Sequence, residues 1–146
     1  MQPTIKILEK IKINSSKNKN EIFTRLYRYL LRPDIYYLAY KNLYANNVAA
    51  TKGVNDDTAD GFSESKIADI ISKLADESYK PKPSRRVYIE KSNGKKRPLG
   101  IPVFRDKIIQ EVLRMILEAV YEPTFSIYSY GFRPNKGCHT ALNVIK

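Results

Sequence analysis

Residues 85–102 of the chain read RRVYIEKSNGKKRPLGIP. Within this stretch, two short strand-like runs at residues 87–89 and 99–101 flank the dipeptide Asn93-Gly94. Asn-Gly between two such runs is a strong signal for a β-hairpin, because both residues tolerate a positive φ. Pro98 has no amide hydrogen to donate, so the strand that contains it should lie at the edge of a sheet. The sequence therefore predicts a β-hairpin with a free edge.

Basic residues crowd this hairpin, and Glu90 is its only acidic residue. An anionic partner such as nucleic acid would relieve the mutual repulsion of the basic side chains. The alternative is an exposed edge hairpin whose charges only prevent pairing with other strands. Charge by itself leaves both interpretations open for the six basic residues, which are Arg85, Arg86, Lys91, Lys95, Lys96 and Arg97.

The whole chain of 146 residues is basic, with a formal net charge of +11 at pH 7. Basic residues dominate residues 1–50 and 80–105, whereas acidic residues outnumber them in residues 51–79. This distribution predicts two basic faces that contribute to one groove for a polyanion. We expect no membrane partner, because no long uncharged apolar run and no signal peptide is apparent. The lone Cys138 cannot form an internal disulfide, which fits a reducing cytoplasm.

Apolar residues at helical spacing predict several helices along the chain. The loops between them should include the polar stretch at residues 14–20 and the stretch at residues 46–61. Prolines 81 and 83 should force an extended lead into the hairpin. The predicted helices cover residues 3–12, 21–31, 35–45, 63–74 and 106–122, and a last one starts near residue 138 and still runs at residue 146, which indicates a fragment of a longer protein.

The helix at residues 106–122 has the widest apolar face and is expected to be core scaffold without direct chemistry. Asp106 should cap its start. Two pairs of opposite charge, Lys107 with Glu111 and Arg114 with Glu118, are spaced i, i+4 and should lie on its outer face.

Four tyrosines in residues 35–45 admit two interpretations. They could stack on nucleobases beside Lys41. They could instead fill a helix–helix interface with their hydroxyls reaching solvent, and this interpretation is favoured for each one. The four are Tyr36, Tyr37, Tyr40 and Tyr44.

The adjacent Asp56 and Asp57 invite comparison with the paired aspartates of polymerases. Their neighbours are glycine, asparagine, threonine and a further aspartate, which favour a turn and not a rigid strand end. A metal site is also not expected at His139 and Cys138, because no further ligands surround them. Near the end of the chain, Phe132 precedes Arg133 in a loop at residues 129–137, where the ring should hold the cation in place.

Three sequence blocks in one order resemble a known family. RRVYIEKSNGKKRPLGIP, RDKIIQEVLRMILEAVYEPTF and SYGFRPNKGCHTAL resemble the amino-terminal part of a group II intron-encoded reverse transcriptase and maturase, over residues 33–146. The resemblance implies an α+β fold: the fingers subdomain of a right-hand polymerase, with a basic hairpin packed on helices and without the catalytic palm strands. Residues 1–50 would be a helical amino-terminal extension, residues 51–79 a loop and an accessory helix, and residues 80–146 the fingers.

The same resemblance assigns roles to the hairpin. Lys91 and Arg97 would grip the triphosphate of the incoming nucleotide, and Arg85 would lie near the template strand. Glu90 departs from the family, which has proline at this position. Contacts with the templating base or with RNA are implied for Arg86, Lys95, Lys96, Leu99, Gly100, Ile101, Pro102 and Arg133.

The resemblance places the catalytic acidic residues beyond residue 146, on a palm strand and in a Tyr-x-Asp-Asp turn. We therefore expect no catalytic residue, metal site or cofactor in residues 1–146 and no polymerase activity from them alone, although Mg²⁺ is implied for the full enzyme. The expected partners are intron RNA, template RNA, an RNA/DNA primer–template duplex and deoxynucleotides, and a homodimer stays open. The alternative function is a non-catalytic basic RNA-binding module.

The implied role of Lys91 and Arg97 depends on the length of the hairpin loop, because side chains alternate across a strand. A two-residue Asn93-Gly94 turn would send these two side chains to opposite faces. A three-residue loop, with Gly94 left-handed, pairs Ile89 with Arg97 and brings them to one face. We therefore predict the longer loop, with a positive φ at Gly94 and not at Asn93.

Overall fold

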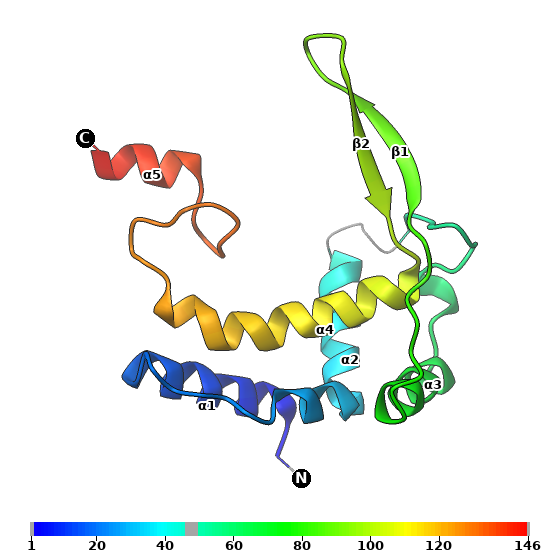
Figure 1. Ribbon diagram of the computed structural model, residues 1–146, viewed down its shortest axis with the longest axis horizontal. Coiled ribbons are helices and arrows are strands. Elements are labelled where there is room, and N and C mark those ends of the chain that lie inside the picture. Colours follow the sequence, from blue (N-terminus) through cyan, green and yellow to red (C-terminus); the bar gives the residue numbers. More distant parts are fainter. Residues whose placement is uncertain (1, 46–49, 146) are drawn as a thin grey trace. The chain divides into compact units, whose positions relative to one another are not determined.

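The structure is a computed structural model that describes residues 2–45 and 50–145. Its helices and its two-stranded antiparallel sheet confirm the α+β class. Figure 1 colours the chain in sequence order and labels its α-helices and strands, and the name η is used here for 3₁₀ helices. They are α1 (Thr4–Lys17), η1 (Leu26–Leu31), α2 (Pro33–Ala45), η2 (Ala59–Gly61), α3 (Glu64–Ala75), β1 (Arg85–Glu90), β2 (Lys96–Ile101), α4 (Phe104–Tyr121), η3 (Glu122–Thr124) and α5 (Cys138–Ile145).

The chain forms two compact units. The hairpin unit is Arg25–Arg114, and the terminal unit joins Met1–Thr24 to Met115–Lys146. This division follows packing, whereas the three segments that the sequence suggested stay a prediction. Within the part of the chain that the structure describes, no helix combines the length and the apolar character that crossing a membrane requires.

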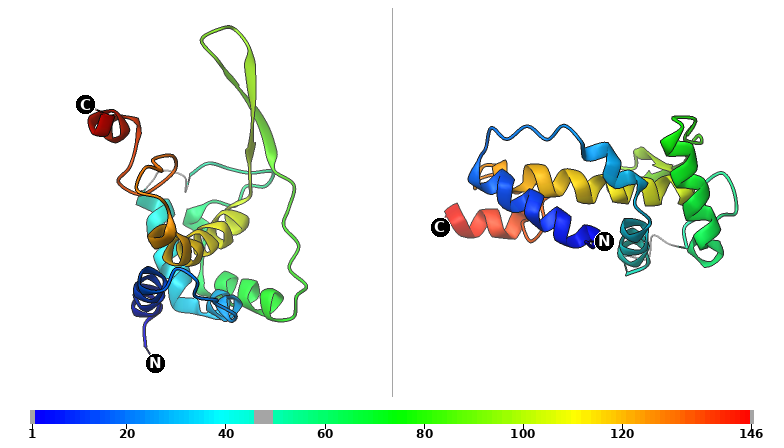
Figure 2. Two further views of the ribbon diagram at one scale, coloured as in Figure 1. Left: turned by 60° about the vertical axis from the view of Figure 1, so that its left-hand side comes forward. Right: turned by 90° about the horizontal axis from the view of Figure 1, so that it is seen from below.

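The core of the hairpin unit lies between α2, α3 and the first half of α4. These helices bury one apolar stripe each, as the spacing of their apolar residues predicts. Burying large side chains of this kind contributes about 1.5–3 kcal/mol each. The hairpin of β1 and β2 extends away from these helices as a narrow ribbon (Figure 2). Residues of this core include Ile35, Tyr36, Ala39, Ile67, Ile70, Val103, Phe104, Ile108 and Val112.

Two of the four tyrosines on α2 pack against neighbouring elements, as favoured from the sequence, but their hydroxyls bind backbone carbonyls and do not reach solvent as expected. Tyr36 is fully buried, and its hydroxyl donates to the Leu30 carbonyl at 2.8 Å. The ring of Tyr40 stacks on that of Phe62, with 5.9 Å between the ring centroids. The side chains of Tyr37 and Tyr44 are exposed to solvent.

The start of α4 differs from the prediction at two polar residues. The helix begins at Phe104, so Asp106 lies inside its first turn and does not precede it as a cap. Its carboxylate is buried and accepts hydrogen bonds from residues that lead into β1. Lys107 is also buried and donates to the carbonyl of Thr51, so its predicted place on the outer face is wrong. Glu111 instead binds Arg114, at 2.8 Å.

The terminal unit places α1 alongside the end of α4 and η3 (Figure 1). The helix α1 runs to Lys17, past the predicted end at residue 12, because Ser15 continues its buried face. The Ser15 hydroxyl donates to the carbonyl of Val120, which satisfies both polar groups inside the unit. Over residues 21–31, the predicted helix is limited to the 3₁₀ helix η1, and the side chain of Ile22 is exposed.

Candidate nucleic-acid interface

The hairpin has the register that a three-residue loop produces. Ile89 pairs with Arg97, and the Lys91 amide donates to the Lys95 carbonyl at 2.8 Å. Gly94 has a φ of +74°, whereas Asn93 is not among the described residues with positive φ. The predicted longer loop is confirmed. A glycine is suited to this position because left-handed backbone carries little penalty without a Cβ atom.

This register separates the basic side chains into two sets, because neighbours along a strand face opposite sides. Lys91, Lys95 and Arg97 share one side, which we call the cationic face, and this face carries no acidic residue. All three are exposed. The cationic face can therefore present two ammonium groups and a guanidinium fork to one anion.

The opposite side of the hairpin carries Arg86, Lys96 and Glu90. Glu90 pairs directly with Lys96, so its negative charge lies away from Lys91 and Arg97. The departure from the family pattern at Glu90 therefore places no acid on the cationic face.

The base of β2 borders an open groove of about 510 Å³. Leu99 and Ile101 point to the same side of the hairpin as the cationic face, and Gly100 points to the other side. A Cβ atom on Gly100 would lie 3.4 Å from the Cβ atom of Ser84, so the close neighbour of this glycine is part of the chain itself. The groove is lined by Leu43, Thr51, Leu99, Gly100, Ile101, Pro102, Lys107, Gln110, Glu111 and Arg114.

A strap at residues 51–53 braces the base of the hairpin, and no local sequence pattern predicts it. Arg85 donates to the carbonyl of Lys52 at 3.1 Å, so the arginine predicted to lie near the template also holds this strap. Burial, and next the charge of Arg85, lower the pKa of the Lys107 ammonium group that binds Thr51. Gly53 packs directly on the backbone of Val103.

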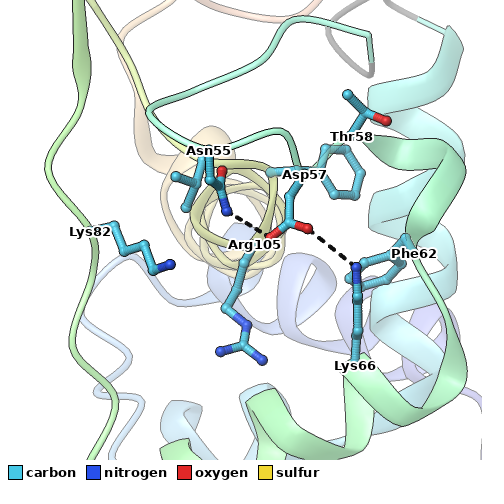
Figure 3. Close-up of a pocket in the computed structure, with 9 residues that line it drawn as sticks. Asn55, Asp57, Thr58, Phe62, Lys66, Lys82 and Arg105 are labelled. Carbon is cyan, nitrogen blue, oxygen red and sulfur yellow. Dashed lines mark hydrogen bonds and ion pairs between the residues drawn. The ribbon is translucent and has the colours of Figure 1, made fainter.

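Of the adjacent aspartates, Asp57 lines a small cavity at the start of α4 (Figure 3). Asp57 accepts from Asn55 at 2.7 Å and pairs with Lys66 at 3.4 Å. Asp56 pairs with Lys52 at 3.0 Å. Both carboxylates therefore have basic or amide partners. The backbone bends at residues 54–56, in agreement with the turn that the sequence favours here. Across residues 2–45 and 50–145, no group of three or more His, Cys, Asp or Glu side chains could hold a metal ion.

Arg133 lies in the terminal unit and is occupied by internal contacts. Its guanidinium group binds Glu122 at 2.8 Å and donates to the carbonyls of Ser126 and Ser129. The ring beneath it is Phe125, 5.3 Å away, and not Phe132, which is fully exposed at a φ of +56°. The expected anchoring by Phe132 is therefore wrong. The role of Arg133 as a nucleic-acid contact stays a prediction, and these contacts give it a structural role.

The chain is similar along its whole length to a group II intron-encoded protein. It is 64% identical over 147 residues to the protein LtrA of Lactococcus lactis subsp. cremoris. It is 43% identical over 144 residues, or 95% of the chain, to an uncharacterized 91 kDa protein in the cob intron of Schizosaccharomyces pombe. It is 36% identical over 135 residues, or 92% of the chain, to the putative COX1/OXI3 intron 2 protein of Saccharomyces cerevisiae.

The similarity covers a minor part of each relative. The chain spans 24% of the length of the Lactococcus protein, 18% of the Schizosaccharomyces protein and 16% of the Saccharomyces protein. No protein-family model matches the chain.

Proposed function

We propose that this chain, which belongs to the family of group II intron-encoded proteins, is the fingers part of an RNA-directed DNA polymerase. In this proposal the cationic face binds the triphosphate of the incoming nucleotide. The observation that carries the proposal is the register of the hairpin, which brings Lys91, Lys95 and Arg97 to one acid-free side. A two-residue turn would have divided them between two sides.

The chemistry of the three side chains suits a triphosphate. A guanidinium group binds phosphate oxygens through two parallel hydrogen bonds, and an ammonium group acts as a point charge that can follow the phosphate chain. Charge that builds on the phosphates during transfer would be offset by Arg97 and Lys91 together. Mg²⁺ is implied for the whole enzyme, but the described residues offer no fitting set of ligands, so no step is assigned to it here.

The template would lie at the base of the hairpin in the same proposal. The groove beside residues 99–102 is apolar along the strand and polar along α4, which suits a nucleotide with its base toward the strand. On the other side of the hairpin, Arg86 and Lys96 would contact RNA, including the intron RNA. Such contacts with phosphates supply affinity that depends on salt and not on base sequence.

A non-catalytic RNA-binding module is the second candidate. It is favoured by the exposure of basic residues on both sides of the hairpin, since adhesion to RNA does not require that Lys91 and Arg97 share a side. The two candidates differ in whether the cationic face recognises a nucleotide triphosphate. The two candidate functions can therefore be distinguished by replacing one lysine on each side of the hairpin and comparing the effects on KM for the deoxynucleotide.

The deciding experiment is steady-state polymerisation by the full-length protein that contains this chain, on a primed RNA template. Lys91→Ala and Arg97→Ala should each raise KM for the deoxynucleotide about tenfold, because each removes a charge-assisted hydrogen bond. Lys96→Ala is the matched control: it removes an equally exposed lysine from the other side and should leave KM within about twofold. Equal effects of Lys91→Ala and Lys96→Ala would favour the RNA-binding module.

Residues 1–146 are proposed to be inactive on their own. The catalytic acidic residues that the family implies, including a Tyr-x-Asp-Asp turn, do not occur among them. Purified residues 1–146, supplied with Mg²⁺, four deoxynucleotides and a primed RNA template, should give no extended primer. Template-dependent extension would refute this part of the proposal.

A further inference from the structure

The direction in which the hairpin points is decided at its base. Apart from Val87 and Ile101, which are half-buried, the residues of β1 and β2 are exposed, so little packing holds the ribbon along its length. A two-stranded ribbon without a packed face is marginally stable and free to swing. Besides the bond from Arg85 to the strap at residues 51–53, the constraints on the cationic face therefore come from the two chain segments that join the strands to the helices.

The outgoing strand is held by its direct connection to α4. Only Pro102 and Val103 separate β2 from the first residue of the helix. Val103 and Phe104 are both almost fully buried in the hairpin unit. The end of β2 is therefore fixed to the start of α4 by two buried side chains.

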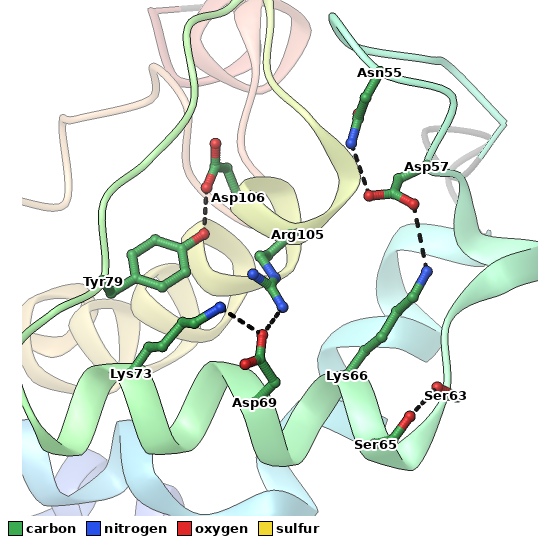
Figure 4. Close-up of polar contacts among 10 residues, drawn as sticks. All are labelled: Asn55, Asp57, Ser63, Ser65, Lys66, Asp69, Lys73, Tyr79, Arg105 and Asp106. Carbon is green, nitrogen blue, oxygen red and sulfur yellow. Dashed lines mark hydrogen bonds and ion pairs between the residues drawn. The ribbon is translucent and has the colours of Figure 1, made fainter.

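The incoming segment is held differently, by the buried carboxylate of Asp106 in the first turn of α4 (Figure 4). One oxygen accepts from the Tyr79 hydroxyl, and the other accepts from the Lys82 amide at 3.0 Å. Residues 76–84 contain no helix or strand, so these bonds lie in an otherwise irregular segment. The lead into β1 is thus fixed to the same helical turn that receives β2.

The surroundings of Asp106 make this attachment firm. Its position in the first turn of α4 favours a negative charge there, because the helix dipole is positive at that end. The preceding residue, Arg105, pairs with Asp69 of α3, so the same turn is also tied to a second helix. Burial, and next the bond to Asp106, raise the pKa of Tyr79, which favours the protonated hydroxyl that donates to Asp106.

We infer that Asp106 is a positioning residue that fixes the direction of the hairpin and so holds the cationic face in its nucleotide-binding position. The inference rests on the proposed function of that face. Asp106 itself contacts no nucleotide and acts through Tyr79 and Lys82. When the attachment is lost, the hairpin points correctly for only a fraction of the time, and the apparent nucleotide affinity falls by that fraction.

The test uses the full-length protein and the same polymerisation assay. Tyr79→Phe removes one of the two bonds, and Asp106→Asn keeps the size of the side chain but offers only one acceptor oxygen. Each should raise KM for the deoxynucleotide by roughly threefold to tenfold and leave kcat within about twofold, because correctly positioned molecules react normally. Hydrogen exchange should show faster exchange of the Lys82 amide in Asp106→Asn, which reports the attachment without reference to activity.

Tyr37→Phe is the matched control for loss of a tyrosine hydroxyl. Its hydroxyl donates to the Glu64 carboxylate at 2.9 Å, within the same unit but at the first residue of α3, away from the lead into β1. This variant should leave KM unchanged. If it raises KM as much as Tyr79→Phe does, the effect is general loss of stability and the inference is overturned.

The Lys91→Ala background separates the inference from the proposed function. Loss of the attachment lowers the fraction of correctly positioned hairpins, and this fraction multiplies whatever affinity the cationic face has, so Asp106→Asn should raise KM by the same factor whether residue 91 is lysine or alanine. A much smaller factor in the Lys91→Ala background, or unchanged KM in both Tyr79→Phe and Asp106→Asn, would overturn the inference while the proposed function stands. Unchanged KM in Lys91→Ala by itself would overturn the proposed function.

Discussion

Lys91 and Arg97 project from the same side of the hairpin, because Ile89 lies opposite Arg97 and Lys91 bonds across the loop to Lys95. The relationship depends on one extra residue in the loop. Without it, every side chain of one strand would change sides relative to the other strand. The loop is therefore the most sensitive point of the candidate interface.

Replacing Gly94 by alanine should destabilise this loop. The residue has a φ of +74°, which costs a residue with a Cβ atom roughly 1 kcal/mol or more. Apart from residue 94 and its two chain neighbours, nothing lies within 4 Å of the position that the new Cβ would occupy, so the expected cost comes from backbone strain. In the full-length protein, we expect a rise of several-fold in KM for the deoxynucleotide.

Gly131→Ala is the control for this substitution. It also has open space around its Cβ position, and its φ is not in the left-handed region. It should leave KM unchanged. If Gly94→Ala and Gly131→Ala have the same KM, the left-handed backbone conformation of Gly94 does not maintain the register of the hairpin.

RNA binding by residues 1–146 should depend steeply on salt. For single strands, the slope of log affinity against log salt changes by about 0.7 for each phosphate neutralised. Replacing Arg85, Arg86 and Lys96 together by alanine should therefore flatten the slope by up to about 2. Fluorescence anisotropy with a single-stranded RNA, at several salt concentrations from low to physiological, would measure this slope for the natural chain and the triple variant.

The variant also distinguishes between parts of the chain. The hairpin and residues 1–50 both carry an excess of basic residues. An unchanged slope would show that the RNA is held by the amino-terminal segment and not by the hairpin. Ile22→Ala, an exposed apolar change outside the hairpin, should leave the slope as in the natural chain.

Local patterns predicted the elements and the hairpin but not the residues that attach one element to another. The turn signal at Asn93-Gly94 allowed two loop lengths, and the family resemblance selected the correct one. Asp106 was misassigned as a cap because its donors lie about 25 residues upstream, beyond the reach of any capping rule. Lys107 was misassigned in the same way, since its i, i+4 spacing to Glu111 carries no information about the carbonyl of Thr51.

Adjacency in the sequence was misleading at Arg133. Phe132 directly precedes Arg133 in the chain, but Phe132 has a positive φ and its ring is exposed to solvent. The ring that lies under the Arg133 guanidinium group is that of Phe125. The acidic partner, Glu122, lies 11 residues upstream. Only folding of the loop brings these groups together, so the sequence carried no local signal for this contact.

Gly53 should tolerate no side chain. A Cβ atom there would lie 2.8 Å from the Cα atom of Val103, which is too close for any real contact, and the obstructing atoms are backbone. Gly53→Ala should therefore lower the free energy of unfolding of residues 1–146 by about 1–3 kcal/mol, as overpacking does. Gly61→Ala, whose Cβ would meet only the Lys66 side chain at 3.6 Å, should unfold in denaturant like the natural chain. Similar unfolding midpoints for the two variants would contradict the close packing of this strap.

The pair formed by Glu122 and Arg133 should make the terminal unit sensitive to acid. Hydrogen bonds from Arg133 lower the pKa of the Glu122 carboxyl below its usual range. A carboxyl with a lowered pKa in the folded state contributes stability above its unfolded pKa of about 4.3, and this contribution is lost as the pH falls through the folded value. Arg133→Ala should cost about 1–3 kcal/mol at pH 7, because it leaves a partly buried carboxylate and two backbone carbonyls without their donor. Arg133→Lys, which keeps the charge but not the guanidinium fork, should recover part of that loss.

Thermal unfolding of residues 1–146 between pH 3 and pH 7 would measure the loss of stability in these variants and its dependence on pH. Glu122→Gln should be less stable than the natural chain at pH 7, and its stability should change less with pH. A pH dependence in Glu122→Gln equal to that of the natural chain would show that other carboxyl groups control the acid sensitivity.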